Sequence, residues 1–332
     1  MLEQPTSRLL FSKKNILGTS LGIVFTTALL YLIGDFFFNL ISLYEGSDYS
    51  QNSSSIDDAS LFYSRQNTPS NIFYYLILDA HFYFWLNILR NLSEDNFFIL
   101  QCLTIAMTFI LIFPTAKTAG KLSNKFFLFA ILLVLFLHPR FIDLVAGNIR
   151  SATAIAFLFW GMTWKASRLR YLLLFAAPTF HLSVGVPLGL YFLSTNWYRL
   201  PRFFNVTEMK MLSIFVITGI LTMLAKTYFP DRGEGVWEGG AAYTIAIFIM
   251  ALYVCFIGKQ IVHNRFGFVA LGLISMAVWG ALLGYASMRY FNYFLPFFAA
   301  SMLIFHRQPS ILIFSFFGLT AFTLISHLTW LY

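Results

Sequence analysis

Residues 147–186 read GNIRSATAIAFLFWGMTWKASRLRYLLLFAAPTFHLSVGV, a stretch that is apolar enough to lie in a lipid bilayer. It carries Arg150 near one end and His181 near the other. An ionisable side chain at membrane depth is costly, so such residues usually face a cavity or a partner and mark functional sites. We therefore expect apolar segments joined by a basic turn, with Arg150 and His181 as the first candidate functional residues.

The composition extends the membrane interpretation to the whole chain. Its 332 residues are 58% hydrophobic and 19% aromatic, and only 11% are charged. Apolar runs recur at lengths that suit a hydrocarbon layer about 30 Å thick, in which helices satisfy their own backbone groups. The sequence predicts an all-α, polytopic helical membrane protein with a single integral membrane domain over 1–332. The net charge of +8 indicates positive cytoplasmic loops and no nucleic-acid partner, because no basic cluster accompanies a soluble fold.

Hydrophobic periodicity and length place the individual helices. We predict membrane helices at 15–40, 97–114, 126–138, 149–164, 211–229, 242–258, 266–284, 290–305 and 311–330. Two further apolar segments, 71–89 and 171–193, are ambiguous. With them the expected number is about nine to eleven membrane helices, including a re-entrant hairpin.

The segment 71–89 is long enough to cross a membrane, but charge argues against it. Counting it as a span would place three lysines on the outer side (Lys117, Lys121 and Lys125), against the preference for cytoplasmic cations. Its many aromatic residues suit a helix that lies flat at the level of the lipid headgroups. We expect 45–96 to form an outer loop followed by this interfacial helix.

The segment 171–193 contains Pro178, Gly185 and Pro187, which interrupt a continuous helix. A re-entrant or broken helical hairpin that enters from the cytoplasmic side and turns near His181 fits this pattern better than a single span. Irregular backbone at membrane depth is tolerated where it lines a cavity, so we expect a cavity open to the outer side.

This topology has a cytoplasmic N-terminus and puts about fifteen of the 22 Lys and Arg residues inside. The cations left on the outer side are Arg65, Arg90, Arg140, Arg150, Lys226, Arg232 and Arg289. Almost all the acidic residues join them. The chemistry is therefore expected at the outer face.

Two candidates follow from position on that face. Asp48 lies in the outer loop closest to the membrane, where a carboxylate can act as a general base or bind a cation, or can simply be a solvated loop acid. Arg150 follows the small, polar Gly147–Asn148 at the start of an apolar helix. Its planar guanidinium can hold a phosphate or a diphosphate, or extend to the interface.

Two more candidates lie in apolar surroundings. His181 is flanked by Phe180 and Leu182, where an imidazole can transfer a proton or serve as a satisfied core residue. Arg289 and Tyr293 share a helix face at i, i+4 spacing. A second arginine suggests recognition of a doubly charged group, and the alternative is an aromatic belt with an incidental cation. The sequence contains no motif for a metal, a nucleotide or another cofactor.

These residues together resemble a known family. The stretch GNIRSATAIAFLFWG, then a basic turn and YLLLFAAPTFHLSVGV, is similar to the EpsG-like branch of the Wzy-type polysaccharide polymerases. Gly46-Ser47-Asp48 and the pair Arg289 and Tyr293 also match in order and spacing. The chain departs from the family at Ser151, because a Gln usually follows the Arg there. The layout of the first half also looks like membrane glycosyltransferases of the GT-C class.

The resemblance implies formation of glycosidic bonds between polyprenyl-diphosphate-linked (undecaprenyl) repeat units at the outer face of the bacterial plasma membrane, as in O-antigen, exopolysaccharide or capsule synthesis. It implies that Asp48, or else His181, is the catalytic base, and that Arg150 and Arg289 bind the diphosphate. Asn148 and Tyr293 are secondary substrate contacts. No cofactor is implied, and a divalent cation has no supporting motif.

Two other functional classes stay open at the level of sequence. A lipid-linked oligosaccharide flippase or exporter also needs cationic groups and a cavity, but its cations are typically reachable from both faces, whereas those here cluster on one. A glycan-modifying membrane acyltransferase would use a membrane-plane histidine, yet a second motif is lacking. The expected partners are the lipid-linked glycan, membrane lipid, and a chain-length regulator and flippase of the same pathway.

Overall fold

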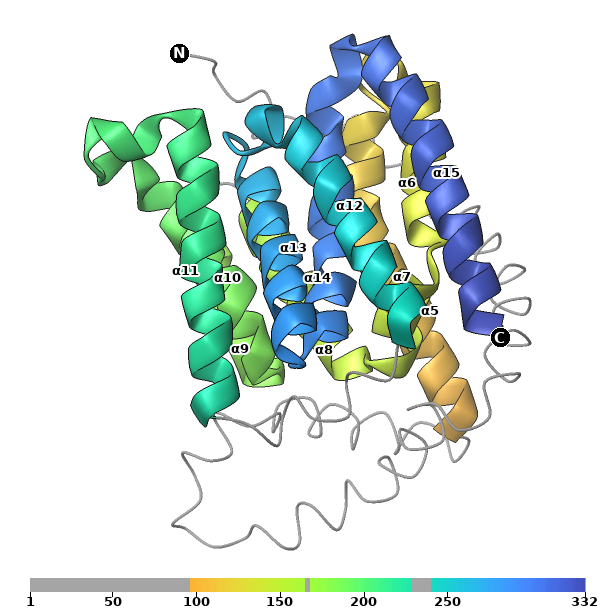
Figure 1. Ribbon diagram of the computed structural model, residues 1–332. Coiled ribbons are helices and arrows are strands. Elements are labelled where there is room, and N and C mark those ends of the chain that lie inside the picture. Colours follow the sequence, from red (N-terminus) through yellow and green to blue (C-terminus); the bar gives the residue numbers. More distant parts are fainter. Residues whose placement is uncertain (1–95, 165–167, 229–239, 332) are drawn as a thin grey trace, which may run out of the picture. The chain divides into compact units, whose positions relative to one another are not determined.

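The computed structural model describes residues 96–164, 168–228 and 240–331 (Figure 1). Within these residues the regular structure is helical and no strand occurs. The prediction of an all-α fold is therefore confirmed for this part of the chain. The predicted helix 15–40, the segment 71–89 and Asp48 lie outside the described residues, as does the loop at 45–96 apart from its last residue.

The backbone divides into two compact units, Met1–Thr118 with Asp143–Gly185, and Ala119–Ile142 with Val186–Tyr332. The described helices of the first unit are α5 (Asn96–Ala119), the π-helix η3 (Asp143–Gly147), α8 (Ile149–Thr163), α9 (Arg168–Phe180) and the 3-10 helix η4 (Leu182–Val184). A single membrane domain over 1–332 stays a prediction.

In the first unit, α8 and α9 pack against each other as an antiparallel pair. Gly161 lies so close to α9 that an added Cβ would be 2.8 Å from Leu174 Cδ2. Further along the pair, the rings of Phe157 and Phe180 stack with centroids 4.6 Å apart. The earlier residue of α8, Phe157, thus contacts the later residue of α9, Phe180. The two helices therefore run in opposite directions, and the start of α8 lies at the same end of the pair as the end of α9.

Helix α5 contacts this pair at a position where a proline removes one backbone hydrogen bond of the helix. Pro114 lies inside α5, and proline has no N–H to bond the carbonyl four residues earlier. That carbonyl belongs to Ile110, and it accepts a hydrogen bond of 2.8 Å from the indole N–H of Trp160 in α8. The Trp160 ring also stacks on Phe113 at 6.3 Å. A tryptophan thus supplies the donor that the proline removed.

The second unit is a larger helical bundle. Its elements are α6 (Lys125–Phe136), α7 (Pro139–Ile142), α10 (Gly185–Asn196), η5 (Trp197–Arg199), η6 (Arg202–Asn205), α11 (Thr207–Tyr228), α12 (Gly240–Ile261), α13 (Arg265–Leu283), α14 (Ser287–Ser301), η8 (Met302–Arg307) and α15 (Pro309–Leu331). Helices α13 and α14 form its centre, and every α14 residue except Arg289 is buried. Since α14 is enclosed by protein, the helices around it supply the outer surface.

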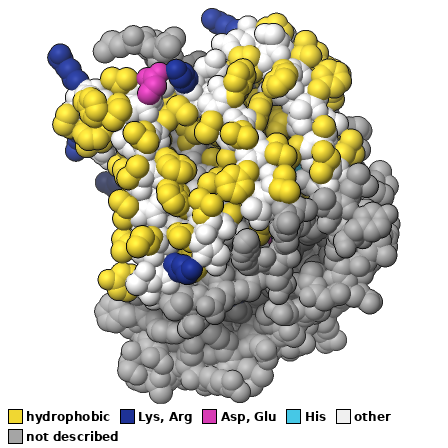
Figure 2. Space-filling view, in the orientation of Figure 1, with side chains coloured by type: hydrophobic (Ala, Val, Ile, Leu, Met, Phe, Trp, Pro, Cys, Tyr) yellow, Lys and Arg dark blue, Asp and Glu magenta, His cyan; other side chains and the backbone are white. Residues whose placement is uncertain are grey.

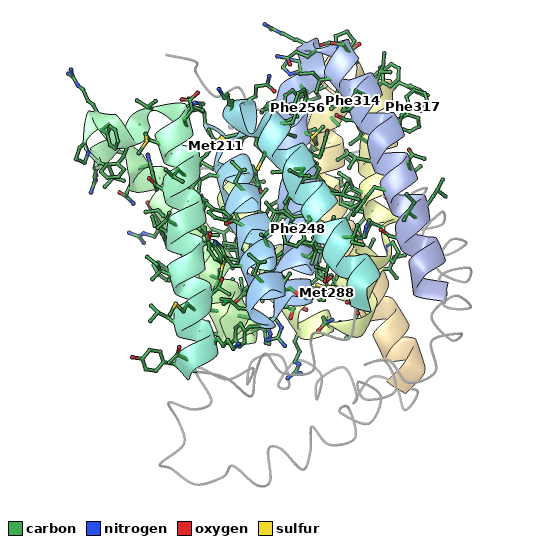
Figure 3. The ribbon with its side chains drawn as sticks, viewed as in Figure 1. Met211, Phe248, Phe256, Met288, Phe314 and Phe317 are labelled. Carbon is green, nitrogen blue, oxygen red and sulfur yellow. The ribbon has the colours of Figure 1, made fainter. Side chains whose placement is uncertain are left out.

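That outer surface is apolar. Phe256 on α12 and Phe314 on α15 are exposed, and their ring centroids are 6.4 Å apart (Figure 3). Hydrophobic side chains cover the visible face of α11 and α12, and charged side chains gather mainly near the end where α11 begins (Figure 2). Exposed apolar faces of this extent are typical of surfaces that meet lipid.

Four described helices are long and apolar enough to cross a membrane: Thr207–Tyr228, Thr244–Ile261, Arg265–Leu283 and Pro309–Ser326. A fifth span results if the bent pair Lys125–Phe136 and Pro139–Val145 counts as one. The structure therefore fits a helical membrane protein with four or five such spans in its described part. The count of nine to eleven stays a prediction.

The predicted helix 126–138 is present as α6, which ends two residues earlier, at a bend. Helix α6 stops at Phe136, and the chain bends by 67° before it continues from Pro139. Proline cannot donate a backbone hydrogen bond, and it disfavours helical geometry in the residue before it. The prediction ended the helix just before Pro139, but it did not foresee that the chain continues as the short helix α7 after a sharp bend.

The other described helices, α5, α8 and α11 to α15, occur where the sequence predicts them. The predicted interruption of 171–193 is also present, because α9 ends at Phe180 and α10 begins at Gly185. Pro187 fits the first turn of α10, where its missing N–H costs nothing. Whether the two halves form a re-entrant hairpin stays a prediction.

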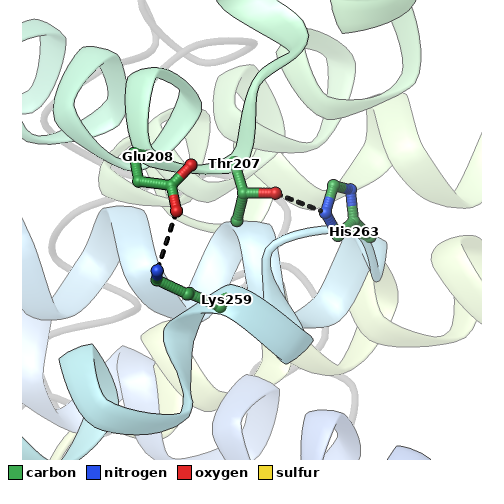
Figure 4. A network of polar contacts seen from close by, with 4 residues as sticks. All are labelled: Thr207, Glu208, Lys259 and His263. Atoms are coloured by element: carbon green, nitrogen blue, oxygen red, sulfur yellow. Dashed lines mark hydrogen bonds and ion pairs between the residues drawn. The ribbon is translucent and has the colours of Figure 1, made fainter.

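A polar network ties the start of α11 to the end of α12 and the turn that follows (Figure 4). Glu208 forms a 2.7 Å ion pair with Lys259, and the Thr207 hydroxyl lies 3.2 Å from His263 Nε2. Partial desolvation of its ring, and then the charge of Lys210, lower the pKa of His263 below its ordinary value.

A glycine in α13 allows the tight turn into α14. A Cβ on Gly280 would lie against the carbonyl oxygen of Tyr285 and 2.9 Å from the Ser287 Cα. We expect Gly280→Ala to lower the free energy of unfolding by about 1–3 kcal/mol, because backbone atoms must move. Chemical unfolding in detergent measures this.

The matched control is Gly318→Ala in α15, where a Cβ meets nothing within 4 Å. That change should be neutral or stabilise by up to about 1 kcal/mol, since alanine is the better helix former. Equal losses for both variants would contradict the role of close packing at Gly280.

The lowered pKa of His263 gives stability a pH dependence of definite sign. The folded state favours the neutral imidazole, so this contribution is complete above the unfolded pKa of about 6.5 and is lost as the pH falls below it. We expect His263→Gln to lose less thermal stability than wild type between pH 7 and pH 5. The difference should be under about 1 kcal/mol, because His263 is exposed. A larger acid loss in the variant would refute the assignment.

Candidate functional site

Arg150 lies in the first turn of α8, which begins at Ile149. The turn contains no acidic residue, and the N-cap Asn148 makes no side-chain capping hydrogen bond. The first N–H groups of a helix lack intrahelical partners, and the helix dipole makes this end positive. A guanidinium added there gives a site with the chemistry of an anion-binding helix terminus.

The residues just before α8 form a π-helix. The Asn148 backbone N–H bonds the Asp143 carbonyl at 2.9 Å, five residues back, and the Asn148 side-chain amide lies 3.5 Å from the Asp143 carboxylate. Single π-turns are rare and frequently occur at functional sites. Asp143 was missed by the sequence analysis, and its only signal was an acid between two apolar segments.

His181 follows α9 directly, and its backbone N–H contacts the Ala177 carbonyl at 3.4 Å. The antiparallel packing of α8 and α9 brings it to the same end of the pair as Arg150. Arg150 precedes Phe157 by seven residues, or about 10 Å of helix, and Phe157 stacks on the residue before His181. Both candidates are partly exposed. One end of the first unit thus holds an acid, an amide, a guanidinium and an imidazole.

In the second unit, Arg289 lies in the first turn of α14, just after Ala286 in the left-handed region at φ 50°. Arg289 is partly exposed, whereas Tyr285, Tyr290 and Tyr293 are buried. Tyr293 is 0% exposed, so it belongs to the helical core. The tyrosines therefore do not form the aromatic belt that the sequence left open as an alternative.

The remaining predicted site residue, Asp48, lies outside the described residues. Within 96–164, 168–228 and 240–331, no group of three or more His, Cys, Asp or Glu side chains is arranged to hold a metal ion.

His138 is a buried histidine that the sequence analysis did not single out. It lies at the break between α6 and α7, where its Nδ1 accepts the Arg140 backbone N–H at 3.1 Å. Its ring stacks on Phe322 at 5.1 Å and meets Phe291 edge-on at 5.8 Å. This geometry suits a neutral imidazole that stabilises the bend. A histidine directly before a proline in an apolar run was the available signal.

Comparison with protein-family models, with curated proteins and with solved structures finds no match to this chain.

The role of His138 as a structural acceptor can be tested by two substitutions. We expect His138→Phe to lower the free energy of unfolding by about 1–3 kcal/mol, because the Arg140 N–H loses its acceptor in a buried site. His138→Asn retains an acceptor at a similar position and should lose less. Unfolding in detergent measures both, and a smaller loss for the Phe variant would show that the hydrogen bond is unimportant.

Proposed function

We propose that the protein is a membrane glycosyltransferase that polymerises cell-surface polysaccharide in the bacterial plasma membrane. Its substrates are polyprenyl-diphosphate-linked oligosaccharide repeat units, and the reaction takes place at the outer face. The observation that carries the proposal is Arg150 in the first turn of α8, at the same end of the α8–α9 pair as His181.

The start of α8 has the properties that binding of a diphosphate requires. A cation in a first helical turn is disfavoured by the helix dipole by about 0.3–1 kcal/mol, so it gains most when an anion lies beside it. The guanidinium of Arg150 can bind two phosphate oxygens at once. Asn148, oriented by Asp143, offers an amide donor to the same region.

The reaction needs one proton acceptor and stabilisation of a leaving group. The acceptor hydroxyl oxygen bonds to the anomeric carbon of the donor sugar, and the bond from that carbon to the diphosphate oxygen breaks. The electron pair leaves with the diphosphate, whose developing charge Arg150 stabilises. The hydroxyl proton passes to a base, for which His181 and Asp48 are the candidates.

The apolar surface of the helical bundle in the second unit suits substrates that carry polyprenyl chains. Exposed aliphatic and aromatic side chains on α11, α12 and α15 keep the protein in the layer where such chains reside. Lipid-linked donor and acceptor then reach the enzyme by diffusion within the membrane. Arg289, in the first turn of α14, is a second phosphate-binding candidate and is tested by its own variant.

The first experiment measures polymer formed from lipid-linked repeat units by the reconstituted protein. We expect Arg150→Gln to lower the rate by about 100-fold to 1,000-fold, the usual cost of removing a donor that stabilises transition-state charge. Arg150→Lys should lie between, because it keeps the charge and loses the bidentate geometry. Arg168→Gln is the matched control, since Arg168 is exposed at the opposite end of α9.

Companion variants separate the two candidate bases. His181→Asn or Asp48→Asn should lower the rate by about 100-fold to 10,000-fold, whichever residue is the base. Arg289→Gln tests the second arginine. Folding is checked by thermal unfolding in detergent. Wild type that moves the substrate between leaflets without forming polymer would refute the glycosyltransferase assignment.

A further inference from the structure

Lys210 is a buried cation without an acidic partner among the described residues. It lies in the first turns of α11 and is only 9% exposed. Its Nζ is 5.8 Å from the centroid of Trp197 and 5.3 Å from that of Phe268. Aromatic faces attract a cation, but they accept none of its three N–H groups as a phosphate or carboxylate oxygen would. The ammonium is therefore held in place with its hydrogen-bonding capacity available.

Glu208, two residues before Lys210 in the sequence, is already engaged. Glu208 pairs with Lys259 at 2.7 Å (Figure 4), so it is directed toward α12. The charge of Lys210 also contributes to the lowered pKa of His263. The end of α11 thus has an excess of positive charge that no described carboxylate balances.

Two more cations lie in the segment that leads into α11. Arg199 and Arg202 belong to the short helices η5 and η6, and both are exposed. A hydrogen bond holds the segment together, because the buried Trp197 donates its indole N–H to the Phe204 carbonyl at 2.9 Å. The same Trp197 ring is one of the two aromatic rings that lie beside the Lys210 ammonium. Trp197 therefore contacts Lys210 and also holds the segment that contains Arg199 and Arg202.

The segment also carries exposed aromatic residues. Tyr198 is 69% exposed and Phe203 is 60% exposed, although both are large. The segment directly precedes a helix long and apolar enough to cross a membrane. Amphipathic rings with arginines between them are typical of the membrane interface, where the rings enter the acyl region and the cations meet headgroups.

We propose that Lys210, Arg199 and Arg202 form a binding site for the phosphate of an anionic phospholipid in the leaflet that meets this end of α11. Lys210 supplies a fixed ammonium, and the two arginines flank it from the adjoining segment. Tyr198 and Phe203 contact the acyl chains. This site is separate from the one assigned to catalysis, so the two succeed or fail independently.

The occupant is a lipid because the cations alternate with exposed apolar rings. A free phosphate ion would gain nothing from the Phe203 ring, and the Tyr198 hydroxyl already accepts a hydrogen bond of 3.2 Å from Arg199 Nε. An anionic lipid satisfies both the cations and the rings, and one basic side chain near a membrane surface contributes about 1 kcal/mol to such binding.

The test uses the purified full-length chain in nanodiscs of phosphatidylcholine with increasing phosphatidylglycerol, and counts retained lipids by native mass spectrometry. We expect wild type to retain phosphatidylglycerol selectively. Lys210→Met should weaken this about fivefold to tenfold. Arg199→Gln combined with Arg202→Gln removes two cations and should weaken retention about 25-fold to 100-fold. This variant also guards against misfolding, because both side chains are exposed.

Lys226→Met is the matched control for net charge, since Lys226 lies at the other end of α11 and donates to the Leu283 carbonyl at 2.6 Å. It should retain phosphatidylglycerol as wild type does. Equal retention of the two lipids by wild type, or equal losses in all variants, would overturn the proposal. Displacement of the retained lipid by millimolar inorganic phosphate would also overturn it, because the site would then be one for a free anion.

Discussion

The structure depends on one constraint, which is that backbone polar groups inside an apolar environment must find a partner within the protein. Helices satisfy this along their length, so the informative places are those where a helix is interrupted. At Pro114 the released carbonyl of Ile110 receives the indole N–H of Trp160. At the bend before Pro139, His138 accepts the N–H of Arg140. Each interruption is repaired by one polar side chain from an otherwise apolar surrounding.

The start of α8 differs from these repaired breaks. The N-cap Asn148 forms no capping hydrogen bond, and the first turn presents a cation where an acid would be favourable. The preceding π-turn adds a residue to the helix and directs Asn148 toward Asp143. A helix end that is optimised for stability would use the opposite charge. Under the proposed function, the diphosphate of the substrate would lie beside this positive helix end.

Composition and hydrophobic periodicity were enough to predict where the helices lie. They did not predict local features that depend on a single residue, or which side chains neighbouring helices bury. Long apolar runs located α8 and α13, because burial of such runs leaves few alternatives. The prediction placed the end of α6 to within two residues, but the sequence did not reveal the sharp bend at His138 or the continuation as α7. The π-turn at Asp143 leaves composition unchanged. Spacing placed Arg289 and Tyr293 on one face, but only the packing of neighbouring helices shows that Tyr293 is enclosed and Arg289 is not.

The lysines of the second unit show how partner chemistry separates structural from binding roles. Lys226 donates a hydrogen bond to the Leu283 carbonyl at the end of α13, and Lys259 forms an ion pair with Glu208. Both therefore complete contacts within the fold. Lys210 is more buried than either, yet its described neighbours are two aromatic rings. Burial of an ammonium is costly, and rings repay only part of that cost. Lys210 is the most buried of the lysines whose placement is described, and the proposed lipid phosphate would supply an oxygen acceptor for its ammonium.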